Sequence, residues 1–464
     1  MAAVHGRSLA DGSRAEVIFS VNLMYGCPGM LTERLLTALL RRESARQARL
    51  DNLQRLISVP MAAPDRTYML YLHVPFCEVL CPFCSFHRVQ YHESKARRYF
   101  DALRKEIRLA HEAGYRFDEV YVGGGTPTVG LDQLLETLAL VRDLSPVRTI
   151  SVETNPDDLH DDRLPALRSA GVDRLSVGVQ SLDDNLLREM ERFEKYGGAE
   201  KILGGLEKTA GLFDTLNVDM IFNLPHQTVD SLRNDIDRLT RDVGVDQISW
   251  YPLMGAGSTK IAMRKNMGRV TYDREHAFYN EILDRLSGSY EPVSAWCFSR
   301  RPGSLDEYVV DRDDYIGLGS GAMSYLNGVV YAASFSINRY IRLVNAGHSG
   351  ITREHRFSPR DQMRYYFLMR LFGLSLDKQA AESRWGRRFR RTLWPEFTLF
   401  TALGAIEDDG KCWRLTRKGM YFWVLMMREF FIAVSNFRDL MRIGIRSELD
   451  PEDLPPLPVS DDRR

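Results

Sequence analysis

The sequence predicts an α/β protein: a partial (β/α)6 barrel of the TIM type, followed by an α-rich C-terminal domain. The first observation is that six short runs of β-forming residues lie between residues 67 and 255, each followed by a stretch of helical periodicity. Such alternation is typical of βα units with a parallel sheet. The second is that six units in this length fit an open, partial barrel better than a complete eightfold one. The third is that the chain becomes mainly helical from about residue 355.

The strands are expected where β-branched and aromatic residues gather between turn-forming residues. The intervening helices are expected where apolar residues recur every three or four positions, as they do from Phe100 to Ala110 and from Leu134 to Val141. In a parallel barrel the active site lies at the carboxyl ends of the strands, in the βα loops. The expected strands are 68–74, 119–123, 149–153, 174–179, 217–222 and 247–252.

Outside these strands the pattern changes. Residues 316–325 (IGLGSGAMSY) predict a Gly-rich loop. The aromatic residues between Tyr421 and Phe431 are interpreted first as helix core and second as a wall for a flat apolar substrate. The expected parts are residues 1–66 as an N-terminal accessory helical segment, 67–255 as the barrel core, 256–350 as a core extension with the Gly-rich loop, 351–445 as the C-terminal helical domain and 446–464 as a disordered tail.

Composition excludes several classes of protein. The chain has 464 residues, 44% of them apolar, and 62 basic residues balance 62 acidic ones. It can therefore bury a large core and is not intrinsically disordered as a whole. The balanced charge lacks the basic excess that nucleic-acid binding requires, and it fits an uncharged, flat substrate better. We find neither a run of about 20 apolar residues nor a secretory signal in residues 1–19, so we expect a cytoplasmic protein.

Half of the six cysteines lie within residues 77–84, directly after the first expected strand. Thiolates this close can converge on one centre, and they select zinc, copper(I) or iron–sulfur clusters in a reducing compartment. Spacing alone leaves two alternatives open: a structural zinc site with His87 as fourth ligand, or a [4Fe–4S] cluster with one iron free for catalysis. The candidate ligands are Cys77, Cys81 and Cys84, whereas Cys27, Cys297 and Cys412 are expected to be buried thiols.

Cys-x3-Cys-x2-Cys after the first strand, together with Gly-Gly-Gly-Thr-Pro at 123–127 after the second, resembles the radical S-adenosylmethionine (SAM) superfamily. Within it, six ordered motifs over residues 68–435 resemble the coproporphyrinogen III dehydrogenase-like branch: YLHVPFC, GGGTP, SVETNP, RLSVGVQS, DMIFNLPHQT and YIGLGSGAMS. The resemblance implies that the three cysteines bind a [4Fe–4S] cluster and that SAM chelates its open iron. It therefore favours the cluster over zinc.

The resemblance also implies which residues contact SAM. Tyr71 matches a position that packs near the sulfonium, where an aromatic face suits a cation. Glycines after the second strand let the backbone approach the methionyl amine. Glu153 suits the ammonium or the ribose, and Arg192 is placed to pair with the carboxylate. The implied contacts are Tyr71, His73, Gly123, Gly124, Gly125, Thr126, Glu153, Gln180, Arg192, Asp219, Gly319 and Gly321, with Gly317 in the same late loop.

Each of these positions also has a structural interpretation. The glycine run at 123–125 forms a tight βα turn in many proteins without a ligand. Glu153 and Asp219 could cap the helices that follow them. Arg192 could belong to an exposed ion pair of little energetic consequence. His87 is interpreted as structural or substrate-facing rather than as a ligand.

Departures from the branch pattern favour one group within it. Coproporphyrinogen dehydrogenases usually carry a further cysteine at the position of Phe86, and related haem chaperones an Asp-Phe pair where this chain has Ser85-Phe86. Asn223 replaces a common glycine. CPFCSFHR and the closing LTRKGMYFWVLMMREFF most resemble class C radical SAM methyltransferases of the menaquinone C8-methyltransferase group. That resemblance implies two SAM molecules, methylation of an sp2 ring carbon and a low-potential electron donor such as flavodoxin or ferredoxin, and it identifies no proton acceptor. Because a quinone resides in the membrane, the resemblance also implies a protein with at most peripheral contact to the inner face of the membrane.

Three hypotheses follow. The first is a radical SAM C-methyltransferase on a planar apolar ring, with menaquinone favoured. The second is a haem chaperone that keeps the cluster but transfers no methyl group. The third is a tetrapyrrole enzyme, either an oxygen-independent coproporphyrinogen III dehydrogenase or an anaerobic haem-degrading methyltransferase.

Overall fold

The computed structural model describes residues 50–53, 56–301 and 312–444. Its centre is a sheet that has thirteen strands in this part of the chain. Seven neighbouring strands are parallel, and the strands at both edges are antiparallel. The order across the sheet is β1-β15-β14-β13-β12-β2-β5-β6-β7-β8-β9-β11-β10.

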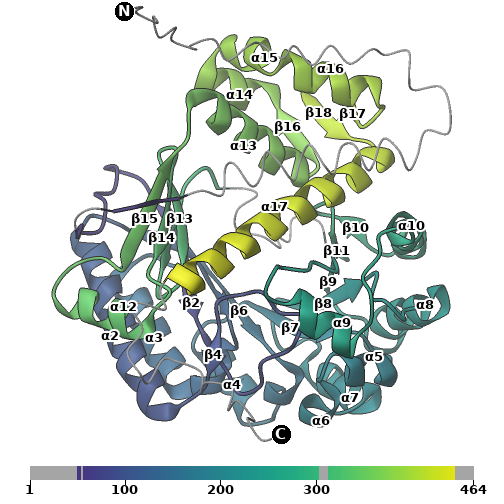
Figure 1. Ribbon diagram of the computed structural model, residues 1–464, viewed down its shortest axis with the longest axis horizontal. Helices are drawn as coiled ribbons and strands as arrows, with labels where there is room; N and C mark the ends of the chain where they lie inside the picture. The colour runs from purple at the N-terminus through teal and green to yellow at the C-terminus, as the bar shows by residue number, and fades with distance from the viewer. Residues whose placement is uncertain (1–49, 54–55, 302–311, 445–464) are drawn as a thin grey trace, which may run out of the picture.

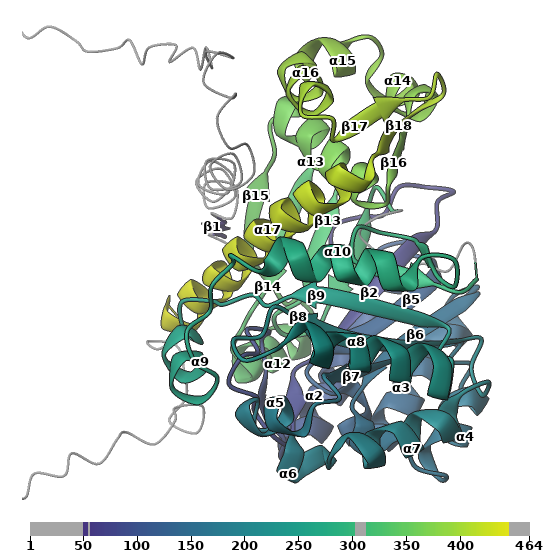
Figure 2. The ribbon, with the colours of Figure 1, turned by 90° about the vertical axis from the view of Figure 1, so that its right-hand side faces the viewer.

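Six of the parallel strands are those that the sequence predicts, and the partial barrel is therefore confirmed. They are β2 (Tyr68–Val74), β5 (Phe117–Gly124), β6 (Thr149–Thr154), β7 (Arg174–Gln180), β8 (Thr215–Phe222) and β9 (Gln247–Pro252). The helices between them cover the outer face of the sheet (Figure 2). These helices are α2 (Glu93–Glu112), α3 (Leu131–Leu144), α4 (Arg163–Ser169), α5 (Asp184–Glu189), α6 (Phe193–Tyr196), α7 (Ala199–Thr209) and α8 (Val229–Asp237), with short helical turns at Pro127–Gly130, Pro156–Asp158 and Arg238–Val243. After β9, α10 (Glu275–Leu286) packs beside α8, whereas α9 (Lys260–Asn266) projects away from the sheet (Figure 2).

The two faces of the parallel sheet differ in chemistry, because successive residues of a strand point to opposite faces. One set of alternate residues is aliphatic and fully buried in the main core together with the helices, as Leu72, Val122 and Val152 illustrate. The other set is mainly polar or aromatic, with Met69 and Ile221 among the exceptions. It includes Tyr71, Tyr121, Glu153, Ser176, Asn217, Asp219 and Ser249. A polar inner face suits ligand binding better than a barrel interior filled with aliphatic side chains.

The prediction of a Gly-rich loop at 316–325 is wrong. Most of this stretch forms two strands, β12 (Tyr315–Leu318), which lies parallel beside β2, and β13 (Met323–Leu326). Residue 317, within β12, is a glycine because β13 comes very close: a Cβ on Gly317 would lie 2.1 Å from the carbonyl oxygen of Met323. The sheet continues through β14 (Val329–Ala333), β15 (Ile351–Arg356) and β1 (Asp51–Asn52), with α12 (Ile337–Asn345) inserted; β11 (Cys297–Ser299) and β10 (Glu291–Pro292) extend the opposite edge.

The C-terminal region is α-rich, as predicted, and also carries a three-stranded sheet. Its last helix, α17 (Arg417–Gly444), runs diagonally across the front of the large sheet (Figure 1). Tyr421, Phe422 and Trp423 of α17 are buried in the core, which confirms the first interpretation of this aromatic stretch. The other elements are α13 (Pro359–Phe372), β16 (Ser375–Asp377), α14 (Lys378–Trp385), α15 (Arg388–Thr392), α16 (Trp394–Ala402), β17 (Ile406–Asp408) and β18 (Cys412–Leu415).

Buried charges fix α17 to the barrel. The Arg428 guanidinium pairs with the carboxylates of Glu275 in α10 and of Glu429, and all three side chains are at most 2% exposed. Near its start, α17 also packs closely against the segment just before β17, because a Cβ on Gly419 would lie 1.8 Å from the carbonyl oxygen of Ala405. The helix is thus held at a fixed height above the barrel.

Several predictions fall on residues outside the described ranges: most of the N-terminal helical segment expected at 1–66, Cys27 and the tail 446–464. The five domain boundaries stay predictions. Cys297 and Cys412 are buried thiols, as expected. Among the described helices, none combines the length and the apolar character that crossing a membrane demands.

Candidate functional site

The three clustered cysteines lie on one loop at the carboxyl end of β2. Cys77 belongs to β3 (Phe76–Cys77), which pairs with β4 (Val89–Gln90) and so closes the loop at its base. Cys77 and Cys81 are buried and Cys84 is partly buried. Arg88 donates hydrogen bonds to the carbonyl oxygens of Cys81 and Cys84, the latter at 2.9 Å. The cysteines therefore lie where the sequence predicts, and Arg88, which the sequence did not single out, holds the loop together.

Two donors from other loops point at the thiol sulfurs. The Thr126 hydroxyl donates to Sγ of Cys77 at 3.6 Å, and the Arg192 guanidinium donates to Sγ of Cys81 at 3.4 Å. Burial raises the pKa of the Cys77 thiol to about 12, while the bond from Thr126 opposes this rise. Arg192 is only 3% exposed, so the alternative of an exposed ion pair is wrong.

Asn155, which sequence analysis missed, joins these two donors. Its amide donates to Oγ1 of Thr126 at 2.7 Å, and its carbonyl oxygen accepts from Arg192 at 3.1 Å. An unbroken chain of hydrogen bonds therefore leads from Cys77 through Thr126, Asn155 and Arg192 to Cys81. The sequence contains one indication of a role for Asn155: it lies two residues after Glu153, just past the end of the third predicted strand.

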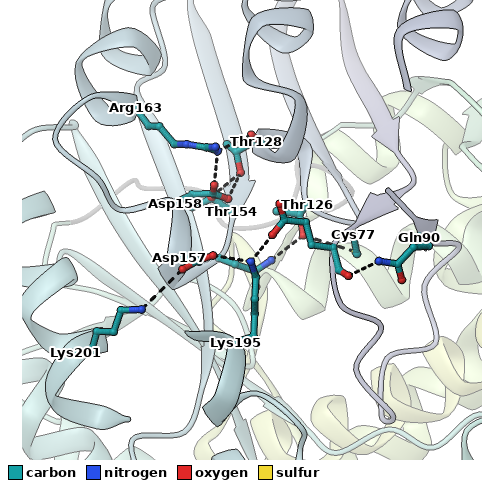
Figure 3. A network of polar contacts seen from close by, with 12 residues as sticks. Cys77, Gln90, Thr126, Thr128, Thr154, Asp157, Asp158, Arg163, Lys195 and Lys201 are labelled. Carbon is teal, nitrogen blue, oxygen red and sulfur yellow. Dashed lines mark hydrogen bonds and ion pairs between the residues drawn. The ribbon is translucent and has the colours of Figure 1, made fainter. Parts of the chain in front are cut away.

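A wider polar network holds the same loops in place. Lys195 of α6 pairs with Glu78 of the cysteine loop and with Asp157 at 2.7 Å. Figure 3 shows this network reaching from Cys77 and Thr126 to the loop after β6. Further members drawn there are Gln90, Thr128, Thr154, Asp158, Arg163 and Lys201. Three successive strand ends are thus tied to one another around the cysteines.

Tyr71 and His73 lie on the inner face of β2 and form hydrogen bonds with other groups of the protein. Nε2 of His73 faces the carbonyl oxygen of His87 at 2.9 Å, so this nitrogen must donate and Nδ1 must accept from the Tyr71 hydroxyl, also at 2.9 Å. Burial lowers the pKa of His73 to about 4, which keeps the imidazole neutral. His87 stacks on His73 and bonds Ser320, which supports its structural interpretation.

Close packing accounts for most of the predicted glycines. Gly123, Gly124 and Gly125 leave space for Glu153, His73 and the carbonyl of Phe76, respectively, which would lie within 2.7 Å of an added Cβ. The late glycines do the same for other neighbours: Gly319 faces the Tyr99 hydroxyl and Gly321 faces the His87 ring, each within 2.5 Å of an added Cβ. The glycine positions are therefore required by the fold itself.

The remaining predicted residues lie along the inner face. Glu153 accepts from the backbone N–H of Gly124 at 3.0 Å and from the Tyr121 hydroxyl at 2.9 Å, and Asp219 accepts from Ser176 at 2.9 Å. Neither carboxylate caps a helix, so that alternative is wrong for both. Gln180 ends β7 at a bulge with φ of 77°. The structure thus brings the predicted residues of β2, β5, β6, β7 and β8 to one end of one face.

Helix α17 completes the site from above. Ser435 bonds Ser85 of the cysteine loop at 2.8 Å, and Arg442 donates to the carbonyl oxygens of Ser85 and Phe86. The Arg438 guanidinium lies 4.7 Å from the centre of the Phe86 ring. No local sequence pattern predicted this contact, because it joins residues about 350 positions apart.

Comparison with known proteins now defines the family. A model described as the radical SAM superfamily matches residues 71–239. The heme chaperone HemW of Mycobacterium tuberculosis strain H37Rv is 33% identical over 282 residues, which cover 57% of this chain and 70% of that protein. The chain belongs to the radical SAM superfamily, in the branch of HemW and coproporphyrinogen III oxidase.

Other relatives agree with this placement. Anaerobilin synthase of Escherichia coli O157:H7 is 25% identical over 405 residues, 83% of this radical SAM protein and 88% of the relative. The solved coproporphyrinogen III oxidase (HemN) of Escherichia coli superposes with a TM-score of 0.67 at 23% identity, over 84% of this chain and 92% of the other, and shares the fold. None of these three proteins is described as a menaquinone methyltransferase.

Membership of the radical SAM superfamily implies a [4Fe–4S] cluster and SAM, and the residues present fit them. Three thiols lie on one loop, near enough that the charges of Cys84 and Cys81 raise the pKa of Cys77 further. Two hydrogen-bond donors point at the sulfurs, which suits the negative charge of thiolate ligands in a cluster. Nε of Arg192 is buried without a partner in the described part of the chain, so this guanidinium keeps a donor for a ligand. No three described His, Cys, Asp or Glu side chains are close enough to hold a single metal ion.

Proposed function

We propose that this protein is a radical SAM enzyme that acts on a tetrapyrrole bearing carboxylate groups, of the haem or coproporphyrinogen type. The observation that carries the proposal is the position of two arginines of α17 at the cysteine loop. Arg442 bonds the loop carbonyls, and Arg438 covers Phe86. Guanidinium groups bind carboxylates with charge-assisted, often bidentate hydrogen bonds. An uncharged quinone has no carboxylate to accept them.

Arg438 also faces the inner wall of the sheet. Its positive charge contributes to the pKa values of Tyr71, His73 and Tyr315, although burial dominates all three. Tyr71, Tyr315 and Phe357 belong to one buried aromatic cluster on this side of the sheet. A cation beside aromatic rings suits a flat conjugated ring with an acidic edge. The names of the relatives, heme chaperone and anaerobilin synthase, support the same class of ligand.

The roles proposed for the chain follow from the contacts. Cys77, Cys81 and Cys84 would hold the cluster, and Arg192 and Thr126 would donate to the sulfurs and stabilise their negative charge. When bound and reduced, the cluster with SAM supplies a 5′-deoxyadenosyl radical that removes a hydrogen atom. Helix α17, fixed over the strand ends, would keep water away from that radical. A low-potential flavodoxin or ferredoxin is the proposed electron donor.

The test is an anaerobic assay of the reconstituted protein with SAM, dithionite and one ring compound at a time. We expect 5′-deoxyadenosine and an altered ring with haem or coproporphyrinogen III. Arg438→Gln should weaken haem binding by about 10- to 100-fold, the effect of losing a hydrogen bond to a charged group. Arg108→Gln, on the exposed surface of α2, is the matched control. Equal haem affinity in both variants would contradict the proposal.

The second candidate is C-methylation of an uncharged ring, with menaquinone first, using two SAM molecules. The observation that favours it is Phe86, which is 43% exposed on the cysteine loop. At this position the coproporphyrinogen dehydrogenases that the chain resembles usually carry a further cysteine. A phenyl ring there offers apolar contact instead of a thiol. Formation of S-adenosylhomocysteine with 5′-deoxyadenosine identifies methyl transfer, and parallel reactions with a demethylated quinone and with haem decide between the rings.

A further inference from the structure

The segment from residue 254 to residue 272 is strongly basic within a chain of zero net charge. It contains Lys260, Arg264, Lys265 and Arg269 and no acidic residue. All four side chains are exposed, and none forms an ion pair with an acidic residue in the described ranges. The positive charge of this segment is therefore directed to the solvent.

The same segment carries a prominent aliphatic side chain. Ile261, in α9, is 83% exposed, which is the highest value among the exposed large apolar residues of the described chain. Leu440, near the end of α17, is 67% exposed. Exposed aliphatic groups surrounded by basic groups mark sites of interaction with a partner or a membrane.

Hydrogen bonds connect α9 with α17. Asn436 accepts from the backbone N–H of Gly257 at 3.0 Å, and Asp439 accepts from the backbone and the hydroxyl of Ser258 at 2.8 and 2.6 Å. The turn that leads into α9 is thus fixed beside the turn of α17 that carries Leu440. Figure 2 shows both helices projecting on the same side of the molecule.

This surface lies at the end of the barrel where the substrate must enter. Gly257 and Ser258 follow β9, at its carboxyl end, and Arg442, two residues after Leu440, bonds the cysteine loop. A bilayer that touches α9 would therefore lie next to the cysteines. An amphiphilic ring could pass between bilayer and site without crossing bulk water.

We infer that α9 and the adjoining end of α17 form a docking surface for an anionic phospholipid bilayer. Phosphate headgroups complement the four unpaired cations, and Ile261 and Leu440 reach the acyl boundary below them. The inference is independent of which ring the enzyme uses, since haem and quinones both partition into membranes. It gives the expected peripheral membrane contact a location.

The test is co-sedimentation of the full-length, cluster-loaded protein with phosphatidylcholine vesicles that contain or lack phosphatidylglycerol. We expect binding to the anionic vesicles and loss of binding at high salt. Neutralising Lys260, Arg264 and Lys265 together by glutamine should lower the partition coefficient about fivefold for each charge, on the order of 100-fold in all. Ile261→Asp should lower it at least about tenfold. Lys208→Gln and Leu212→Asp, exposed on and after α7, are the matched controls.

The outcomes separate the occupants of this surface. Vesicle binding that the α9 variants remove and the α7 variants retain, at unchanged iron content, establishes the bilayer. Absence of vesicle binding, or binding that the α9 variants leave unchanged, overturns the inference. Cross-linking of Lys260 and Lys265 to an acidic flavodoxin, without vesicle binding, also overturns it and assigns the surface to the electron donor.

Discussion

Replacing Asn155 by alanine removes the link between the two donors that serve the cysteines. The change deletes one hydrogen bond with the charged Arg192, at 3.1 Å, and one with Thr126, at 2.7 Å. A bond to a charged group contributes about 1.5–3 kcal/mol and a neutral one about 0.5–1.5 kcal/mol, and Asn155 is only half-buried. We therefore expect the free energy of unfolding to fall by about 2–4 kcal/mol.

The same substitution should also loosen the cluster. Without Asn155, Thr126 and Arg192 no longer fix each other's direction toward Cys77 and Cys81. We expect less iron after reconstitution and faster loss of cluster absorbance in air. The assays are anaerobic unfolding in guanidinium chloride and iron determination, with Asn185→Ala, on the exposed surface of α5, as control. An Asn155→Ala protein with wild-type unfolding midpoint and full iron content would refute the relay.

Three further predictions concern separate parts of the molecule. Cys81→Ala should abolish the brown cluster absorbance, whereas Cys412→Ala, in β18, should retain it. Burial raises the pKa of Asp235 from 3.8 to about 7, so the folded protein holds a proton that the unfolded chain releases. The free energy of unfolding should therefore fall by up to about 4 kcal/mol as the pH rises through this window, and Asp235→Asn should flatten that dependence in denaturation measured at several pH values. Arg428→Met should lower the free energy of unfolding by about 3–5 kcal/mol because it leaves Glu275 and Glu429 buried without their cation, and replacing both carboxylates by leucine in the same chain should restore much of the loss.

The sequence predicts the parallel strands because their residue types and spacing are local properties. β12 escaped prediction because its glycine was taken for a loop residue, whereas Gly317 serves the close approach of β13. Asn223, which replaces a common glycine, has a φ of 65°, a left-handed conformation that asparagine tolerates better than other side chains. The backbone at residue 223 therefore keeps the left-handed conformation that glycine adopts easily, although the residue here is asparagine.

Prediction of the site was limited in the same way. The cysteine loop is a local motif and was found, but the direction of a side chain depends on neighbours from distant strands. His73 was predicted to contact SAM, yet both its ring nitrogens are used by Tyr71 and by the carbonyl of His87. Arg438 carries no local motif and gains its position from the packing of α17, which only the assembled fold reveals.

The position of charge, rather than its sum, bears on the substrate. Zero net charge suggested an uncharged ring, because a sum over the whole chain conceals local excess. The folded chain places Arg438 and Arg442 at the cysteine loop and four further cations on the segment that follows β9, all at the same end of the barrel. Cations at the inner position suit the carboxylates of a tetrapyrrole, and cations at the outer position suit a phospholipid surface. If the substrate is instead an uncharged quinone, Arg438→Gln should leave its turnover unchanged while the α9 variants still reduce it on vesicles, so one pair of variants separates recognition of the ring from delivery by the membrane.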